Sequence, residues 1–247
     1  MKKVPAVFVL GLITLWGAFG QAPTATEVME RVDSQRGPET ARSRMAMRIF
    51  PNLDAQVHER EIRLISYARG LDDSLIEFVA PRSIAGLKVL DAGGAIRVFF
   101  PSTGRVRNIG GSGRGGSVGG VGGDFSYEDM GGAGFLEDYR DFRMVRETPD
   151  HYVISGVPTA ADSRYSRLVF HVDRKLYVPV VIEYYEGENK VKRLDASRIV
   201  ETGGRNVATH LTMNNFADNS RTEIRLQDVE WDVPLHPDLF HPNRFYR

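Results

Sequence analysis

The chain has 247 residues with 32 basic and 32 acidic side chains, so its formal net charge is zero. A hydrophobic fraction of 42% is enough for one domain with a sizeable core. The lack of a basic surplus argues against a nucleic-acid-binding protein. The absence of cysteine excludes both a disulfide framework and thiol chemistry.

The first 20 residues resemble a secretory signal peptide. Lys2 and Lys3 form a positive start, an apolar run follows, and Ala18 and Gly20 have the spacing of a cleavage site. The alternative is an uncleaved membrane anchor, because the run is only slightly too short to span a bilayer. We expect cleavage, and no cysteine follows that could carry a lipid anchor. The mature protein, residues 21–247, is therefore expected to be exported, soluble and unanchored.

One helix is predicted directly after this segment. Thr24 and Glu27 have the spacing of a capping box, in which the two residues satisfy each other's backbone amides. The apolar residues that follow at helical spacing are Val28, Met29 and Val32. The helix is expected over residues 25–36, because Gly37-Pro38 would stop it.

Alternation of apolar and polar residues dominates the rest of the chain, as in half-buried β-strands. Short turns separate the runs, for example Asp91-Ala92-Gly93-Gly94. We expect about eleven strands and one or two helices. This predicts a mainly β fold in which an antiparallel meander curls into a barrel or half-barrel, as a single domain over residues 21–247.

A glycine-rich segment interrupts the strands at residues 110–134. It contains the pattern G-x-G-x-x-G from Gly111 to Gly116, but a phosphate loop requires a helix directly afterwards and no helical pattern follows. We expect either a mobile surface loop without a specific task or a flap. In a flap, Phe125 and Tyr127 would point the same way if the backbone were extended, and would dock on an apolar surface.

No catalytic or metal-ligating pattern stands out. The six histidines lack the spacing of a zinc motif, and there is no G-x-S-x-G elbow. Glu128-Asp129 and Glu137-Asp138 are weak candidates for paired carboxylates, because neighbours on a strand face opposite sides. Solvated acidic turns explain them as well. The sequence therefore predicts no catalytic residue, no metal and no cofactor.

The apolar faces of the predicted strands have two readings, an ordinary core or a cavity for an apolar ligand. Methionine favours the second reading because its thioether adapts to irregular ligands. The candidates for lining such a cavity are Met45, Met47, Ile62, Leu64, Ile96, Val98 and Phe100. The candidates for a lid or flap over it are Val28, Met29, Val32, Phe125 and Tyr127.

Three segments together carry a family resemblance. They are Ile76-Glu-Phe78 with Pro81 and Gly86-Leu-Lys-Val-Leu90, Ile96-Arg-Val-Phe-Phe-Pro101-Ser-Thr-Gly104-Arg-Val-Arg107-Asn-Ile109, and Gly123-Asp-Phe-Ser-Tyr-Glu-Asp129. The acidic and aromatic block in the last segment is the most specific. The chain resembles the outer-membrane lipoprotein-sorting family, the LolA-like periplasmic proteins. It departs from that pattern in being richer in glycine just before the block.

The resemblance implies an unclosed antiparallel β half-barrel with a helical lid over its mouth. Its apolar concavity would hold the acyl chains of a lipoprotein or another lipid. Each methylene in water costs about 0.8 kcal/mol, so an acyl chain needs a container to cross the periplasm. The implied function is a carrier without catalysis, moving cargo toward the outer membrane.

The partners implied by the resemblance are an inner-membrane transporter and an outer-membrane acceptor, with no nucleic acid. Two other functions stay open at this point. One is a secreted hydrolase on a β scaffold. The other is an accessory domain of a membrane transporter that binds no lipid.

Overall fold

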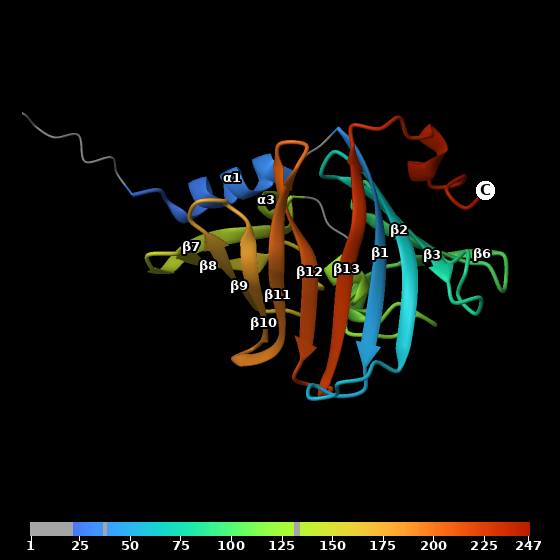
Figure 1. The fold of residues 1–247 in the computed structure, drawn as a ribbon, viewed down its shortest axis with the longest axis horizontal. Helices are drawn as coiled ribbons and strands as arrows, with labels where there is room; N and C mark the ends of the chain where they lie inside the picture. Colours follow the sequence, from blue (N-terminus) through green and yellow to red (C-terminus); the bar gives the residue numbers. More distant parts are fainter. Residues whose placement is uncertain (1–21, 37–38, 131–133) are drawn as a thin grey trace, which may run out of the picture.

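The computed structural model describes residues 22–36, 39–130 and 134–247, and the expected signal peptide lies outside them. The described residues form thirteen strands in one antiparallel sheet (Figure 1). The strands of the first half are β1 (Thr40–Phe50), β2 (Arg60–Arg69), β3 (Asp73–Ala80), β4 (Lys88–Ala92), β5 (Ala95–Phe100) and β6 (Arg105–Ile109). Those of the second half are β7 (Tyr139–Glu147), β8 (His151–Pro158), β9 (Arg167–Asp173), β10 (Pro179–Glu186), β11 (Asn189–Thr202), β12 (Arg205–Asn215) and β13 (Ser220–Trp231).

The described part of the chain has one long helix and several single turns. The helical elements are α1 (Ala25–Arg36), α2 (Tyr127–Met130), α3 (Phe135–Asp138) and the 3-10 turns η1 (Gly111–Gly115) and η2 (Pro237–Phe240). The predicted capping box of α1 is confirmed. The amide of Glu27 donates to Oγ1 of Thr24 at 3.2 Å, and the amide of Thr24 donates to the Glu27 carboxylate at 2.7 Å.

The order of the strands explains why the sheet does not close. It is β6-β5-β4-β3-β2-β1-β13-β12-β11-β10-β9-β8-β7, so the first strand pairs with the last and each hairpin adds outward. Consequently β6 and β7 are consecutive in sequence but lie at opposite edges. The predicted unclosed antiparallel sheet is confirmed. The connection from β6 to β7, residues 110–138, must cross from one edge to the other, and we call it the crossing segment.

Two apolar clusters occupy the concave face of the sheet. On β1, Met47 lies opposite Ile224 of β13 and Ile62 of β2, so these side chains share one face. The first cluster contains Met47, Ile62, Leu64, Phe78, Ile96 and Val98, from β1 to β5. The second contains Val28, Met29, Val32, Ile154, Phe170 and Met213, and it joins α1 to the strands from β8 to β12. Helix α1 thereby covers part of the concave face.

A third cluster lies on the opposite, convex face. Leu75 and Leu90 are paired across β3 and β4, next to the Ile76–Val89 pair of the concave face, so alternation turns them outward. Phe240 and Phe245 of the C-terminal tail bury them. The tail shows little periodicity in sequence because its side chains pack as a cover instead of forming a strand.

Candidate functional site

Two adjoining cavities open on the concave face, at the end where β1 begins and β13 ends (the upper end in Figure 1). Their volumes are about 340 Å³ and about 240 Å³. Four residues line both of them, namely Val207, Ala208, Leu211 and Trp231. We call this end of the half-barrel the mouth.

The cavities differ in the elements that enclose them. The larger lies between Val32 of α1, Phe135 of α3 and the inner face of β10 to β12, which contributes Ile182 and Leu194. The smaller lies against β1 and β2, where Met45 and the short side chains of Ala41 and Ala68 line it. Most of the lining is apolar, so the pair of cavities suits an apolar ligand.

The polar groups of the larger cavity are Gln35 near the end of α1, Tyr177 in the connection before β10, and Arg205 and Asn206 at the start of β12. The guanidinium of Arg205 lies 5.2 Å from the ring centre of Trp231. Its Nη1 is 3.4 Å from a carboxylate oxygen of Asp232. Arg31 of α1 donates to the hydroxyl of Tyr177 at 2.6 Å. We call these side chains together the rim: Gln35, Tyr177, Arg205 and Asn206, with Arg31, Trp231 and Asp232 in contact with them.

Below the mouth, the crossing segment fills the concave face. Val118 and Val121 are each 1% exposed and belong to the first cluster. Arg60 of β2 donates to the carbonyls of Gly120 and Val121, at 3.1 and 2.8 Å. The expectation of a loop lying free on the surface is therefore wrong for this part, because its few apolar side chains and its carbonyls find partners on the sheet. Its mobility stays a prediction.

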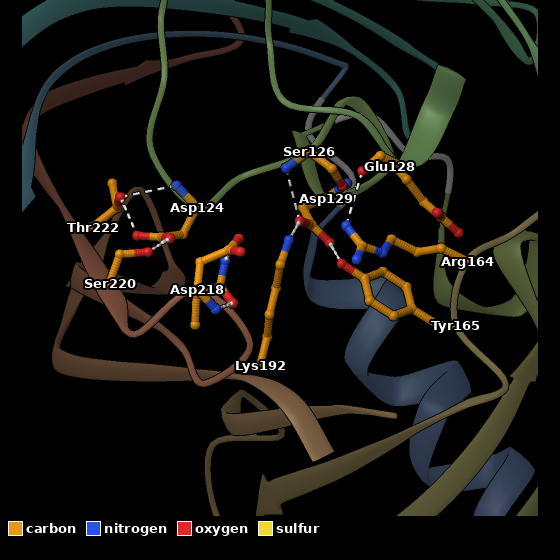
Figure 2. A network of polar contacts seen from close by, with 12 residues as sticks. Asp124, Ser126, Glu128, Asp129, Arg164, Tyr165, Lys192, Asp218, Ser220 and Thr222 are labelled. Carbon is orange, nitrogen blue, oxygen red and sulfur yellow. Dashed lines mark hydrogen bonds and ion pairs between the residues drawn. The ribbon is translucent and has the colours of Figure 1, made fainter. Parts of the chain in front are cut away.

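The acidic and aromatic block 124–129 is tied to separate parts of the second half of the sheet (Figure 2). The amide of Asp124 donates to Oγ1 of Thr222 at 3.0 Å, and this hydroxyl donates back to the Asp124 carboxylate at 2.7 Å. Ser220 donates to the same carboxylate. Asp124 is thereby fixed to β13.

Asp129 connects the block to β11 and to the residues just before β9. It accepts hydrogen bonds from the ammonium of Lys192 at 2.8 Å, the hydroxyl of Tyr165 at 2.9 Å and the amide of Ser126 at 2.8 Å (Figure 2). The side chains of Lys192 and Asp129 are only 4% and 1% exposed. Burial, together with the nearby Asp129 carboxylate, raises the pKa of the Tyr165 phenol far above its usual range, which keeps this phenol protonated as a donor.

Glu128 points to different partners from its neighbour. Its carboxylate accepts a hydrogen bond from Ser163, and burial raises the pKa of Glu128 above its usual value. Glu128 and Asp129 therefore serve separate contacts and do not converge on one point, as a catalytic pair of carboxylates would.

The seven cavity candidates from the sequence lie together in the first cluster. Met47, Ile62, Leu64, Ile96 and Val98 are buried there, and Met45 and Phe100 are partly buried against it. Of the seven, Met45 lines the smaller cavity of the mouth, and Phe100 lines a separate cavity of about 400 Å³ beside residues 82–87. The other five are buried within the cluster.

The lid candidates are divided between the two clusters. Val28, Met29, Val32 and Phe125 are buried in the second cluster, and Val32 also lines the larger cavity. Tyr127 is buried in the first cluster. The two aromatic rings diverge because the backbone is not extended at Tyr127, where α2 begins.

Sequence reasoning missed the residues that enclose the cavities most closely, such as Leu211 and Trp231. The signal for them is present in the sequence, because residues 206–214 and 222–231 alternate in the way that predicts strands. Their inward positions were not singled out. Among the described residues, no group of three or more His, Cys, Asp or Glu side chains has the arrangement of a metal site. No helix of the described ranges is long and apolar enough to cross a membrane.

Solved structures of three proteins share this fold. A domain from Vibrio parahaemolyticus, named for outer membrane lipoprotein sorting, has a TM-score of 0.81 and 21% identity over 91% of this chain and 98% of its own. A DUF1329 family protein from Desulfovibrio piger has a TM-score of 0.79 and 23% identity over 89% and 96%. A LolA superfamily protein from Nitrosomonas europaea has a TM-score of 0.74 and 21% identity over 90% and 99%.

These likenesses confirm the predicted half-barrel, and at such identities they establish the fold. In sequence, a family model described as "Uncharacterized protein" matches residues 70–247. The comparison with curated proteins gives no match.

Proposed function

Because the chain belongs to the family of uncharacterized proteins whose model spans residues 70–247, and has the fold of LolA superfamily structures, we propose that it is a periplasmic lipid carrier. It binds the acyl chain of a lipid or lipoprotein in the cavities at the mouth and moves it toward the outer membrane. The observation that carries the proposal is the pair of adjoining, mainly apolar cavities on the concave face of an open sheet.

The physical reason is the contrast between the mouth and the rest of the concave face. Protein interiors are close-packed, and the first cluster is filled in this way by Val118, Val121 and Tyr127. At the mouth, apolar side chains such as Leu211 and Trp231 line open space instead. An acyl chain entering there removes both its own apolar surface and theirs from water, at about 25 cal/mol per Å².

Helix α1 serves as the lid in this proposal. Val32 lines the larger cavity from one side, while Val28 and Met29 anchor the same helix to the second cluster. A longer chain needs more room than the closed cavity offers, so α1 would move outward to admit it. Neither catalysis nor a cofactor is needed. The donor and acceptor in the membranes are proposed from the fold alone.

The test is a cavity-filling variant with a matched control. Ala196 lies opposite Leu211 on the inner face and lines the larger cavity, whereas the next residue, Ser197, is exposed on the outer face. Ala196→Phe should lower the affinity for a fluorescent fatty acid at least about tenfold, because the ring takes the space of the chain. Ser197→Phe adds the same ring outside the cavity and should bind like the wild type.

Native mass spectrometry of the exported protein completes the test. Wild type should carry a lipid that is missing from Ala196→Phe. A wild-type protein that carries no lipid and takes up no fatty acid would contradict the carrier function. It would favour the alternative of an accessory domain of a membrane transporter that binds no lipid. Ester turnover that is lost on substitution of a single acid would point instead to the hydrolase.

A further inference from the structure

Arg205 holds a fixed position at the end of the larger cavity. It is the first residue of β12, directly after the Gly203-Gly204 turn. Its guanidinium lies 5.2 Å from the ring centre of Trp231, and its side chain keeps 25% exposure. A positive charge therefore lies next to an apolar lining and within reach of solvent.

The donors of Arg205 are weakly engaged. Within the described ranges, its partners are the Asp232 carboxylate at 3.4 Å and the Gly203 carbonyl at 3.5 Å, both long for hydrogen bonds. Asp232 is 53% exposed, so water competes for this ion pair. A guanidinium has five N–H donors in a fork that matches a carboxylate or phosphate. Most of these donors are open to a further anion.

A second guanidinium lies on the same rim. Arg31 of α1 stacks over Tyr177 at 5.0 Å and donates to its hydroxyl, and Tyr177 lines the larger cavity. Glu27, four residues before Arg31 on the helix, accepts the backbone amide of Thr24 at 2.7 Å and also interacts electrostatically with Arg31. The larger cavity thus has Arg205 in its lining and Arg31 bonded to another lining residue, Tyr177, while Asp232 is the carboxylate paired with Arg205.

We propose that the mouth selects amphiphiles with an anionic headgroup, the chain lying in the apolar cavity and the headgroup on Arg205, with Arg31 beside it. This inference rests on the proposed carrier function and names the class of its cargo. A neutral headgroup of the same size would form no ion pair with Arg205, whose guanidinium would keep only its long contacts to Asp232 and the Gly203 carbonyl. A cationic headgroup would meet like charge.

The experiment uses Trp231 as an internal reporter. The chain has two tryptophans, Trp16 and Trp231, so the full chain carrying Trp16→Phe reports from the cavity alone. Dodecanoate, dodecanol and dodecyltrimethylammonium are titrated at about pH 8, where the carboxylate is ionised. Isothermal calorimetry gives a second readout that does not depend on the indole.

The expected result is that dodecanoate binds about tenfold more tightly than dodecanol, and the ammonium compound most weakly. Arg205→Gln should abolish the preference for dodecanoate while leaving dodecanol within about twofold of the wild type. Arg205→Lys, which keeps the charge, should retain part of the preference. Arg44→Gln, on the convex face where Arg44 pairs with Asp228, should retain all of it.

The outcomes separate this inference from the carrier function. If wild type binds all three amphiphiles equally and Arg205→Gln changes nothing, the headgroup selection is wrong and the carrier stands. If none of the three binds, the carrier function itself fails. Acetate, a carboxylate without a chain, should produce no change at the same concentrations. A response to acetate equal to that of dodecanoate would show a plain anion site and overturn the proposal.

Discussion

Lys192 and Asp129 form an ion pair that is almost withdrawn from water, with side-chain exposures of 4% and 1%. Removing two charges from solvent is costly, and the pair is stable only because further donors complete the carboxylate. Tyr165 and the amide of Ser126 are those donors. Through this pair, β11 fixes the crossing segment in one position.

Substitution of one partner of this ion pair should therefore lower the stability of the fold strongly. Lys192→Met leaves the Asp129 carboxylate buried without its cation, and should lower the free energy of unfolding by about 3 kcal/mol. Lys190→Met is the matched control, because Lys190 is 37% exposed and pairs with Glu183, and it should cost less than about 1 kcal/mol. Urea unfolding measures both. Equal losses in the two variants would show that the buried pair does not hold the segment.

Glu128 makes stability depend on pH in the opposite sense from a carboxylate whose pKa is lowered by an ion pair. Burial raises its pKa in the folded protein above the ordinary value of 4.5. The folded state therefore binds this proton more tightly than the unfolded state. The stabilisation is complete below about pH 4.5 and is lost as the pH rises through the folded-state value.

Glu128→Gln has no proton to lose, so it should gain stability relative to the wild type as the pH rises from about 4 to about 7. Urea unfolding at a series of pH values gives the difference directly. If the wild type instead becomes more stable relative to the variant as the pH rises, the hydrogen bond from Ser163 and the neighbouring charges outweigh the effect of burial on the pKa of Glu128.

At the scale of elements, the sequence predicts a helix or strand correctly where the interactions that form it lie within the segment itself. The predicted helix over 25–36 is confirmed as Ala25–Arg36, because the capping box and the apolar spacing are both local. The strand count of about eleven was too low. The sheet also includes short strands such as β6, which is five residues long and leads into the glycine-rich segment.

The glycine-rich part of the crossing segment could not be predicted from its composition. Glycine has no side chain to reveal burial, and the contacts that order this part come from distant residues such as Arg60 and Thr222. The opposite directions of Phe125 and Tyr127 likewise depend on the turn that begins α2. Such contacts exist only once the sheet has formed.

The β11–β12 hairpin offers a test at this scale, because its two glycines differ in one respect. Both have positive φ, 57° at Gly203 and 72° at Gly204, so alanine is strained at either position. A Cβ at Gly203 would lie 2.5 Å from Cδ1 of Trp231, whereas at Gly204 no other atom lies within 4 Å.

Gly203→Ala should therefore cost about 1–3 kcal/mol more than Gly204→Ala, and should weaken fatty-acid binding because Trp231 must move into the cavities. Thermal unfolding and the binding titration check the two parts. If both variants lose the same stability, Trp231 does not pack under the hairpin in solution.

For the whole molecule, the sequence revealed the fold but not the open space within it. The inward positions on β1, β2 and β5 have the same apolar pattern in the sequence whether a ligand or another part of the chain covers them. The crossing segment covers most of them, so the two adjoining apolar cavities lie at the mouth, around β12 and β13, and a separate cavity of about 400 Å³ lies beside Phe100. The positions of α1 and of the described residues of the crossing segment decide which apolar surface stays uncovered.

The most direct measurement is quenching of Trp231 by a fatty acid carrying bromine along its chain, in the full chain with Trp16→Phe. Bromine quenches indole only at close range, and Trp231 lines both cavities. The account predicts saturable quenching by the brominated acid, little effect of the unbrominated acid on the intensity, and loss of quenching in Ala196→Phe. Binding seen by calorimetry without any quenching of Trp231 would place the lipid elsewhere and contradict the account.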